Sequence, residues 1–441
     1  MTAERDTIFA LASGALPSAI ALVRLSGPDA FRIGANLLNG QIPAHGSAVL
    51  REVLGSDSRV VDQAVATAFY APKSYTGEDT LELSLHGGRY IVEQVYGRLI
   101  ELGARIAEPG EFTRRAFEAG KLDLTQAEAV ADLIDAESDA QHRQALQQLG
   151  GSLSDQYDDW RQGMIRALAS LEVYIDFPDE GDVGELDLEP VLAGLWALDI
   201  TMQAALDQSE GAERIREGFL IAIMGPPNAG KSSLLNALAG HEAAIVTDIP
   251  GTTRDFVEVR LRVGPYLVRF SDTAGLRETD DAVERIGVER AYKRAEEADL
   301  RLWLHPIDVA ESQRIDNKSN DISVLTKSDL VENPSVSRET LAISSVTGEG
   351  LRTLRREIEE RLDQIVSPAI TPGLTQLRHR QAIERSLSHL RDGIRKIEDE
   401  ALLDLAAEDV RFAANAVASL TGRVDIEDVL GSIFADFCIG K

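Results

Sequence analysis

The stretch "FLIAIMGPPNAGKSSLLNAL", residues 219–238, constrains the fold of this chain more than any other segment. An apolar run of strand length leads into Gly225, and after four more residues the run Gly-Lys-Ser at 230–232 opens a helical pattern. This order is typical of a phosphate-binding loop between a strand and a helix. Glycines let backbone N–H groups curl around an anion, the helix adds its positive dipole end, and Lys231 reaches the outer phosphates. A chance match is the alternative, but strand and helix are both in place, so we predict a parallel α/β nucleotide-binding domain.

Two later segments predict how this domain handles magnesium and the γ-phosphate. Thr253, in a polar stretch, is placed to join the Ser232 hydroxyl on magnesium only when a γ-phosphate is present, as a switch loop does. Alternating apolar residues over 256–270 then predict a hairpin. It leads into Asp272, where a carboxylate near magnesium belongs, and Gly275, whose N–H can meet the γ-phosphate.

The stretch "VLTKSDL" predicts the choice of base. Asp329 can accept hydrogen bonds from the ring N–H and the exocyclic amine of guanine, a pair that adenine does not present, so GTP is favoured over ATP. Lys327 would lie along the base, and the backbone of Ser344 and Ser345 would cover its other face. An exposed charged turn is the alternative interpretation. The residues predicted to bind GTP are Asn228, Ala229, Gly230, Lys231, Ser232, Ser233, Thr247, Thr252, Thr253, Asp272, Gly275, Thr326, Lys327, Asp329, Ser344 and Ser345.

The regions before and after this domain differ from it in their apolar periodicity. The first part of the chain has short apolar runs punctuated by Gly and Pro, which indicates an α+β domain with two strands near its start. Long helical segments follow, and after the linker "VSPAITPG" the tail is helical again. We therefore predict a discontinuous helical domain with the mostly parallel α/β domain inserted in it. The expected boundaries are 1–118 for the α+β domain, 119–213 and 369–441 for the helical domain, and 214–368 for the α/β domain.

One helix start is also predicted from local pattern. Thr125 and Glu128 have the spacing of a capping box, and they precede a long helical segment that Gly150 and Gly151 end.

Composition excludes several functions. The chain has 45 Lys and Arg against 73 Asp and Glu, a net charge of -28, which argues against a large basic surface for DNA or an anionic membrane, so any RNA contact must be local. A single cysteine, Cys438, rules out an intramolecular disulfide and Cys-rich metal sites. We therefore expect a cytoplasmic protein with no membrane or DNA partner.

Together these motifs resemble the tRNA modification GTPases of the MnmE (TrmE) family, in the TRAFAC class. Two further stretches carry the resemblance: "AEPGEFTRRAFEAGKLDLTQAEAVADLIDAES" at 107–138, and "FCIGK" at the end of the chain. The resemblance covers essentially the whole chain. It implies an N-terminal domain that dimerises and binds folate, a helical domain in two segments, and an inserted GTPase domain.

The resemblance also implies a function. Such a protein forms a homodimer and, with an FAD-dependent MnmG-like protein in a heterotetramer or larger assembly, adds an aminomethyl-type (carboxymethylaminomethyl) group to carbon five of a wobble uridine in tRNA. The one-carbon unit would come from 5-formyltetrahydrofolate or methylenetetrahydrofolate. The alternative is a regulatory RNA- or ribosome-associated GTPase without modification chemistry. Such a protein would be expected to carry a basic RNA-binding module, whereas this chain is acidic.

Catalytic roles in hydrolysis follow from the resemblance. Leu276 stands where many small GTPases have a water-orienting Gln, so Glu284 would orient the water instead, alongside Lys231 on the phosphates. Asn228 matches the potassium ligand of the family, and potassium would supply positive charge to a stimulated GTPase. For Glu284 the alternative is a carboxylate on a helix surface.

Folate and uridine residues are also implied. Arg24, Glu82 and Lys121 match the folate site, and ordinary surface charges are the alternative for each. Cys438 would act as a nucleophile or acid-base group on uridine, whereas a lone cysteine is more often a small buried hydrophobe.

Two positions depart from the family pattern. Thr326 replaces the usual Asn that ties the phosphate loop to the guanine pocket, which predicts weaker nucleotide binding, although its hydroxyl can still make one such hydrogen bond. Pro226 stands where Arg is frequent.

Overall fold

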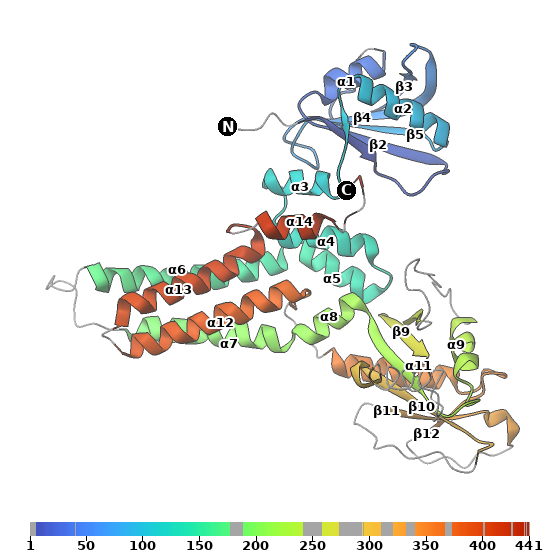
Figure 1. Ribbon diagram of the computed structural model, residues 1–441, viewed down its shortest axis with the longest axis vertical. Coiled ribbons are helices and arrows are strands. Elements are labelled where there is room, and N and C mark those ends of the chain that lie inside the picture. The colour runs from blue at the N-terminus through green and yellow to red at the C-terminus, as the bar shows by residue number, and fades with distance from the viewer. Residues whose placement is uncertain are drawn as a thin grey trace, which may run out of the picture. The chain divides into compact units, whose positions relative to one another are not determined.

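The computed structural model forms two compact units (Figure 1). Unit 1 comprises Met1–Ala131, Ser154–Gln162 and Ala414–Lys441, and unit 2 comprises Asp132–Leu153 and Gly163–Ala413. The structure describes residues 6–39, 41–176, 188–240, 258–272, 293, 295–309, 321–331, 340–366, 373–399, 402–424, 427–435, 437 and 439–440.

Unit 1 is built on a six-stranded sheet in the order β3-β4-β5-β2-β1-β6. Its pairs are antiparallel except for β1 and β6. Helices α1 and α2 share one apolar core with alternate residues of the strands, such as Val23, Leu83 and Ala66. The strands are β1 Ile8–Leu11, β2 Ile20–Ser26, β3 Ala48–Leu54, β4 Val60–Phe69, β5 Thr80–His86 and β6 Arg105–Ile106, and the helices are α1 Ala30–Leu37 and α2 Arg89–Glu101.

The other helices of unit 1 bring the end of the chain to its first domain. Helices α3 (Glu111–Glu118) and α14 (Glu427–Ala435) contact each other, and Ile439 forms an antiparallel bridge with Pro109. Gly110 begins α3 with a φ of 67°, and a Cβ there would lie 2.8 Å from the carbonyl oxygen of Phe434. A side chain larger than hydrogen would therefore push the two segments apart.

Unit 2 contains most of the helices predicted for the discontinuous domain, whereas α14, in the predicted segment 369–441, belongs to unit 1. Helix α7 packs against α12, where Arg391 binds Asp199 at 2.6 Å and Gln203 at 2.8 Å (Figure 1). Helices from before and after the α/β domain thus meet, as predicted. Their bounds are α4 Leu124–Asp135, α5 Asp139–Leu149, α6 Ser152–Asp176, α7 Glu189–Asp207, α8 Ser209–Glu217, α12 Leu377–Glu398 and α13 Leu403–Ala418, with α4, α6 and α13 shared between the units. No helix within these described ranges has the length and apolar character needed to cross a membrane.

The predicted α/β domain is the second sheet of six strands, in the order β12-β11-β10-β7-β9-β8. All its pairs are parallel except the hairpin β8–β9. The central strand β7 is buried along its whole length, because its two faces pack into two separate apolar clusters. The elements are β7 Phe219–Met224, α9 Lys231–Gly240, β8 Glu258–Val263, β9 Tyr266–Asp272, β10 Leu300–Pro306, β11 Asp321–Thr326, the 3₁₀ turn η1 Ser328–Leu330, β12 Thr340–Ala342 and α11 Leu351–Ile365.

The start of α4 differs from the predicted capping box. Asp123 Oδ1 accepts from the N–H of Gln126 at 3.0 Å, and Gln126 Oε1 accepts from the N–H of Asp123 at 3.0 Å. The box is therefore Asp123 with Gln126. The Thr125–Glu128 prediction is wrong because the Thr125 hydroxyl donates to Asp123 Oδ1 at 2.7 Å instead of capping the helix.

The long helical segment that follows is two helices rather than one. Helix α4 ends at Asp135, and α5 begins at Asp139 with Ser138 as its cap, whose hydroxyl oxygen accepts from the N–H of Gln141 at 3.3 Å. The predicted end is confirmed, since α5 stops at Leu149.

Candidate functional site

The phosphate loop connects β7 to α9 and is shaped by backbone of positive φ. Gly225 has φ 146°, Asn228 φ 62° and Gly230 φ 91°. A Cβ on Gly225 would lie 2.7 Å from the carbonyl oxygen of Leu304 on β10, so only glycine fits where the loop leaves the sheet. The loop lies at the carboxyl end of parallel strands, where open α/β sheets bind their ligands.

Lys231 lies over this loop. Its side chain is largely buried, and Nζ donates to the carbonyl oxygens of Gly225 at 2.9 Å and Pro226 at 3.3 Å. Ser232 follows it in the first turn of α9. A cation over a glycine-shaped loop at a helix N-terminus fits a phosphate chain, and the Ser232 hydroxyl is an oxygen donor of the kind magnesium prefers.

Thr326 links the guanine-reading segment to the phosphate loop. It ends β11 and is buried, and its hydroxyl donates to the carbonyl oxygen of Ala229 at 2.7 Å. This is the single hydrogen bond that the sequence analysis allowed a threonine at this position. The phosphate loop and the segment that reads the base are therefore held together without an asparagine.

Asp329 is held by Ser344. The Ser344 hydroxyl donates to Asp329 Oδ1 at 2.6 Å, and its oxygen accepts from the N–H groups of Val346 at 3.2 Å and Thr347 at 3.1 Å. The carboxylate is thus oriented before any base binds. The sequence predicts a contribution from only the backbone of Ser344. The signal for its side chain was a serine followed by turn residues, which favours a side-chain-to-backbone turn.

Lys327 adopts the left-handed conformation, with φ 61°. Its Nζ binds Asp308 Oδ2 at 2.7 Å, and this hydrogen bond lowers the pKa of Asp308. The aliphatic stem of Lys327 is therefore fixed at both ends beside Asp329.

Several predicted residues lie outside the described part of the chain. Asp272 ends β9, as predicted, but its side chain is not described. The others outside the described residues are Thr247, Thr252, Thr253, Gly275, Glu284 and Cys438.

The structure brings two of the three folate candidates together. Arg24 on β2 and Glu82 on β5 are cross-strand neighbours, and Arg24 Nε binds Glu82 Oε1 at 2.9 Å. Lys121 lies beside the loop between β4 and β5, since a Cβ on Gly77 would be 3.6 Å from its Cε. Arg24 and Glu82 therefore form one paired group rather than two separate contacts.

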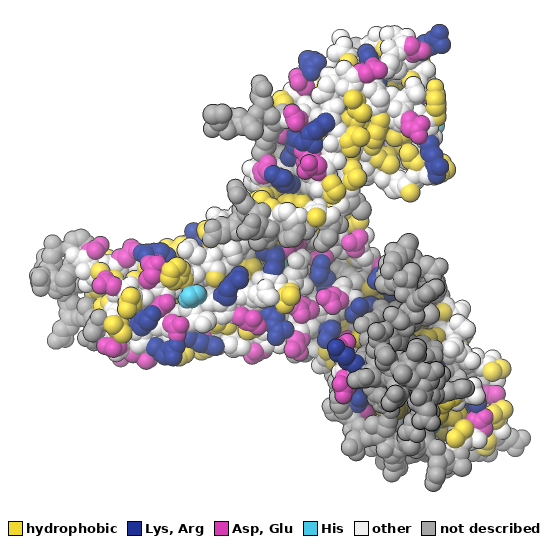
Figure 2. Space-filling view, viewed as in Figure 1, with side chains coloured by type: hydrophobic (Ala, Val, Ile, Leu, Met, Phe, Trp, Pro, Cys, Tyr) yellow, Lys and Arg dark blue, Asp and Glu magenta, His cyan; other side chains and the backbone are white. Residues whose placement is uncertain are grey.

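The charge distribution agrees with the composition. On the face shown in Figure 2, Lys and Arg are interspersed with Asp and Glu over the helices, and the described residues of this face form no large basic surface.

Comparison with known proteins gives matches along the chain. A family model described as "MnmE helical domain" matches residues 124–438, and one described as "GTP-binding protein TrmE N-terminus" matches residues 7–121. The tRNA modification GTPase MnmE of Hyphomonas neptunium is 50% identical over 444 residues, covering 100% of both chains. That of Caulobacter vibrioides is 47% identical over 450 residues, covering 99% of this chain and 100% of the relative.

One solved structure is similar over a smaller part. The G domain of the T. maritima FeoB iron transporter is 24% identical, covers 34% of this chain and 99% of that chain, and gives a TM-score of 0.25, which is too low to support an inference. The two full-length relatives and the two family models are decisive. The chain belongs to the tRNA modification GTPase MnmE family.

Proposed function

We propose that this chain is the GTP-hydrolysing subunit of an enzyme that adds an aminomethyl-type group, carboxymethylaminomethyl, to carbon five of the wobble uridine in tRNA. The observation that carries the proposal is a guanine and phosphate site joined by the Thr326–Ala229 hydrogen bond, in a chain that matches tRNA modification GTPases along its full length. The enzyme works in the cytoplasm with an FAD-dependent MnmG-like partner.

Hydrolysis needs the residues around the phosphate loop. Lys231 would neutralise the outer phosphates of bound GTP, and Ser232, with Thr253, would hold magnesium. Glu284 orients a water whose oxygen bonds to the γ-phosphorus as the bond to the β,γ-bridging oxygen breaks, leaving GDP and inorganic phosphate. Asn228 would hold potassium, which would supply positive charge beside the phosphates.

The one-carbon chemistry belongs to unit 1. Arg24 would bind an acidic group of 5-formyltetrahydrofolate or methylenetetrahydrofolate, with Glu82 and Lys121 as the other residues of the site. The Cys438 thiolate would add to carbon six of the uracil ring as the C5–C6 double bond opens, which places the electron pair on carbon five and makes it nucleophilic. The thiolate would leave again when carbon five loses its proton and the double bond re-forms. The Arg24–Glu82 pair supports this assignment because it holds a guanidinium in a fixed orientation at a largely shielded position of the sheet.

A homodimer is supported by the same sheet. Helices α1 and α2 cover one face, whereas the opposite face carries exposed apolar side chains. Leu50 and Val65 are cross-strand neighbours there, 62% and 38% exposed, and Ile20 is 60% exposed. We propose that a second copy covers this face, since large apolar side chains exposed on one face of a sheet mark an interaction surface.

The test is mass spectrometry of tRNA nucleosides from cells that lack this protein. Cells complemented with the wild type should regain the modified uridine, and cells with Lys231→Ala should not, because hydrolysis drives the reaction. A Cys438→Ser protein that folds and hydrolyses GTP but restores no modified uridine places the thiol in the chemistry. If even the wild type restores no modified nucleoside, this proposal is wrong and the alternative function, a regulatory GTPase without modification chemistry, replaces it.

A further inference from the structure

The guanidinium of Arg24 lies between parts of two separate elements. Its central carbon is 5.3 Å from the ring centre of Tyr75, in the loop between β4 and β5, and 5.6 Å from that of Phe112, on α3. Aromatic rings attract a guanidinium and restrict its plane. The orientation of Arg24 therefore depends on how the loop and α3 are held relative to each other.

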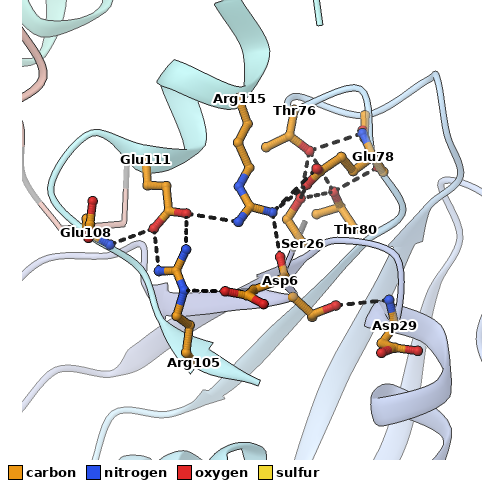
Figure 3. Close-up of polar contacts among 12 residues, drawn as sticks. Asp6, Ser26, Asp29, Thr76, Glu78, Thr80, Arg105, Glu108, Glu111 and Arg115 are labelled. Carbon is orange, nitrogen blue, oxygen red and sulfur yellow. Dashed lines mark hydrogen bonds and ion pairs between the residues drawn. The ribbon is translucent and has the colours of Figure 1, made fainter. Parts of the chain in front are cut away.

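Arg115 connects these two elements (Figure 3). Its Nη1 binds Glu78 Oε2, in the loop, at 3.1 Å, and its Nη2 binds Glu111 Oε1, at the start of α3, at 2.9 Å. Nη1 also donates to the carbonyl oxygen of Asp6 at 2.8 Å. The side chain is only 6% exposed, so each of these contacts is shielded from water.

The partners of Arg115 are themselves fixed. Glu78 Oε2 accepts from the hydroxyl of Ser26, which ends the strand that carries Arg24, at 2.9 Å. Glu111 also binds Arg105 at 2.6 Å. A buried network of charges loses the free energy of solvation, so apolar packing would be more stable in its place. What such a network gives in return is one defined geometry.

A second link joins the same two elements. The Tyr75 hydroxyl lies 2.9 Å from the Thr113 hydroxyl on α3, within hydrogen-bond distance. The Tyr75 ring lies against Arg24, and burial raises the pKa of its phenol, which therefore stays neutral. The loop and α3 are thus joined at Arg115 and again at Thr113.

We propose that Arg115 is a positioning residue of the folate site. By holding Glu78 and Glu111 it keeps Tyr75 and Phe112 closed on Arg24, which is then oriented to receive an acidic group of the tetrahydrofolate. This rests on the proposed folate site. It also gives a role to "EFTRR" at 111–115, part of the sequence signature that GTP hydrolysis does not use.

The test compares Arg115→Gln with Arg114→Gln in the full-length protein. Arg114 is the matched control because it is the next residue of α3, half exposed, and binds only Glu118 on the same helix among the described contacts. Equilibrium dialysis with (6S)-5-formyltetrahydrofolate should show binding weakened about tenfold or more in Arg115→Gln. Arg115→Lys should recover part of the loss, and Arg114→Gln should stay within about twofold of wild type.

A double-mutant cycle separates positioning from general damage. If Arg115 acts through Arg24, then Arg115→Gln should cause no further loss in an Arg24→Gln background. Losses that add in the double variant would overturn the proposal. Because these substitutions lie in unit 1, near-UV circular dichroism and urea unfolding, rather than the GTP hydrolysis of unit 2, report whether each variant is folded.

A readout without ligand keeps the two proposals distinguishable. The Nε–H resonance of Arg24, assigned with Arg24→Lys, should show ring-current shifts that Arg115→Gln removes and Arg114→Gln retains. If wild type binds no folate but the resonance behaves in this way, the folate site is lost and the positioning role stands without it. A resonance unchanged in Arg115→Gln overturns the positioning role. If Arg115→Gln does not fold, two milder variants replace it. Arg115→Lys weakens the link to Glu78, and Thr113→Val removes the link to Tyr75. The shift of the Arg24 resonance in each is then compared with that in Arg114→Lys.

Discussion

Thr326 and Ser344 each bring one hydroxyl into the guanine site, and each donates it to a protein atom. Thr326 donates to the carbonyl oxygen of Ala229, and Ser344 to Asp329. The first contact was open to prediction, because a threonine in the place of an asparagine keeps one donor. The second was not, because a serine in a turn has many local partners and only the folded loop selects one.

Replacing Thr326 with Val removes the donor and keeps the shape. The carbonyl oxygen of Ala229 then loses its partner, and we expect guanine nucleotide binding to weaken by about 1–2 kcal/mol, roughly five- to thirtyfold. Fluorescence titration with a labelled GDP measures the change. Thr326→Ser keeps the hydroxyl and is the control, and a Val variant with wild-type affinity would contradict the role of the bond.

Replacing Ser344 with Ala should reduce discrimination between bases. Asp329 loses the donor that orients it, so the contact to the exocyclic amine of guanine weakens most. We expect the ratio of IDP to GDP dissociation constants to fall by about tenfold or less, since one hydrogen bond to a charged group is removed. Competition titrations with the two nucleotides measure it. Thr347→Val, in the same turn, is the control, and an unchanged ratio in Ser344→Ala would exclude orientation by Ser344.

At the scale of elements, the strands and helices were largely predictable because their apolar periods are strong. The β8–β9 hairpin and the strand–loop–helix around Lys231 are where their patterns placed them. The start of α4 could not be predicted, because the pairs Asp123–Gln126 and Thr125–Glu128 both fit the capping-box pattern. The contacts of Asp123 and Thr125 with Ser154 on α6 decide between them, and no local pattern contains that information.

Asp123→Ala removes the cap of α4 and its contact with α6. We expect the free energy of unfolding to fall by about 1–2 kcal/mol, the range for loss of an N-cap. Asp135→Ala, at the opposite end of the same helix, should change it by less than about 0.5 kcal/mol. Chemical denaturation followed by circular dichroism compares the two, and equal effects would show that the capping box does not matter.

At the scale of the whole molecule, the order of domains was predictable, but the grouping of the chain into units was not. Changes in residue composition and apolar periodicity mark domain boundaries along the sequence. They carry no information about which distant segments are in contact. That residues after Ala414 group with the first domain depends on contacts such as the bridge between Pro109 and Ile439.

Unit 1 should lose stability in acid through Glu111. Burial alone would raise the pKa of this carboxyl, but hydrogen bonds from Arg105, the Glu108 N–H and Arg115 outweigh it and lower the pKa from 4.5 to about 2. A lowered pKa contributes stability above the unfolded value of 4.5 and loses it as pH falls toward 2.

Urea unfolding of wild type and Glu111→Gln at several pH values measures this contribution. The difference in unfolding free energy between the two should be full at pH 7 and should shrink below about pH 4.5. A difference that stays constant from pH 7 to pH 3 would show that the Glu111 carboxylate is not stabilised by its charge.

The bridge from Pro109 to Ile439 has a consequence for the order of folding during translation. The inserted α/β domain is complete once residue 366 has left the ribosome, so its sheet can form while synthesis continues. Unit 1 contains the first residues made, yet its last bridge has to wait for Ile439. The N-terminal domain is therefore the first to leave the ribosome and the last to complete its contacts. Until Ile439 is made, almost at the end of synthesis, Pro109 lacks its bridge partner.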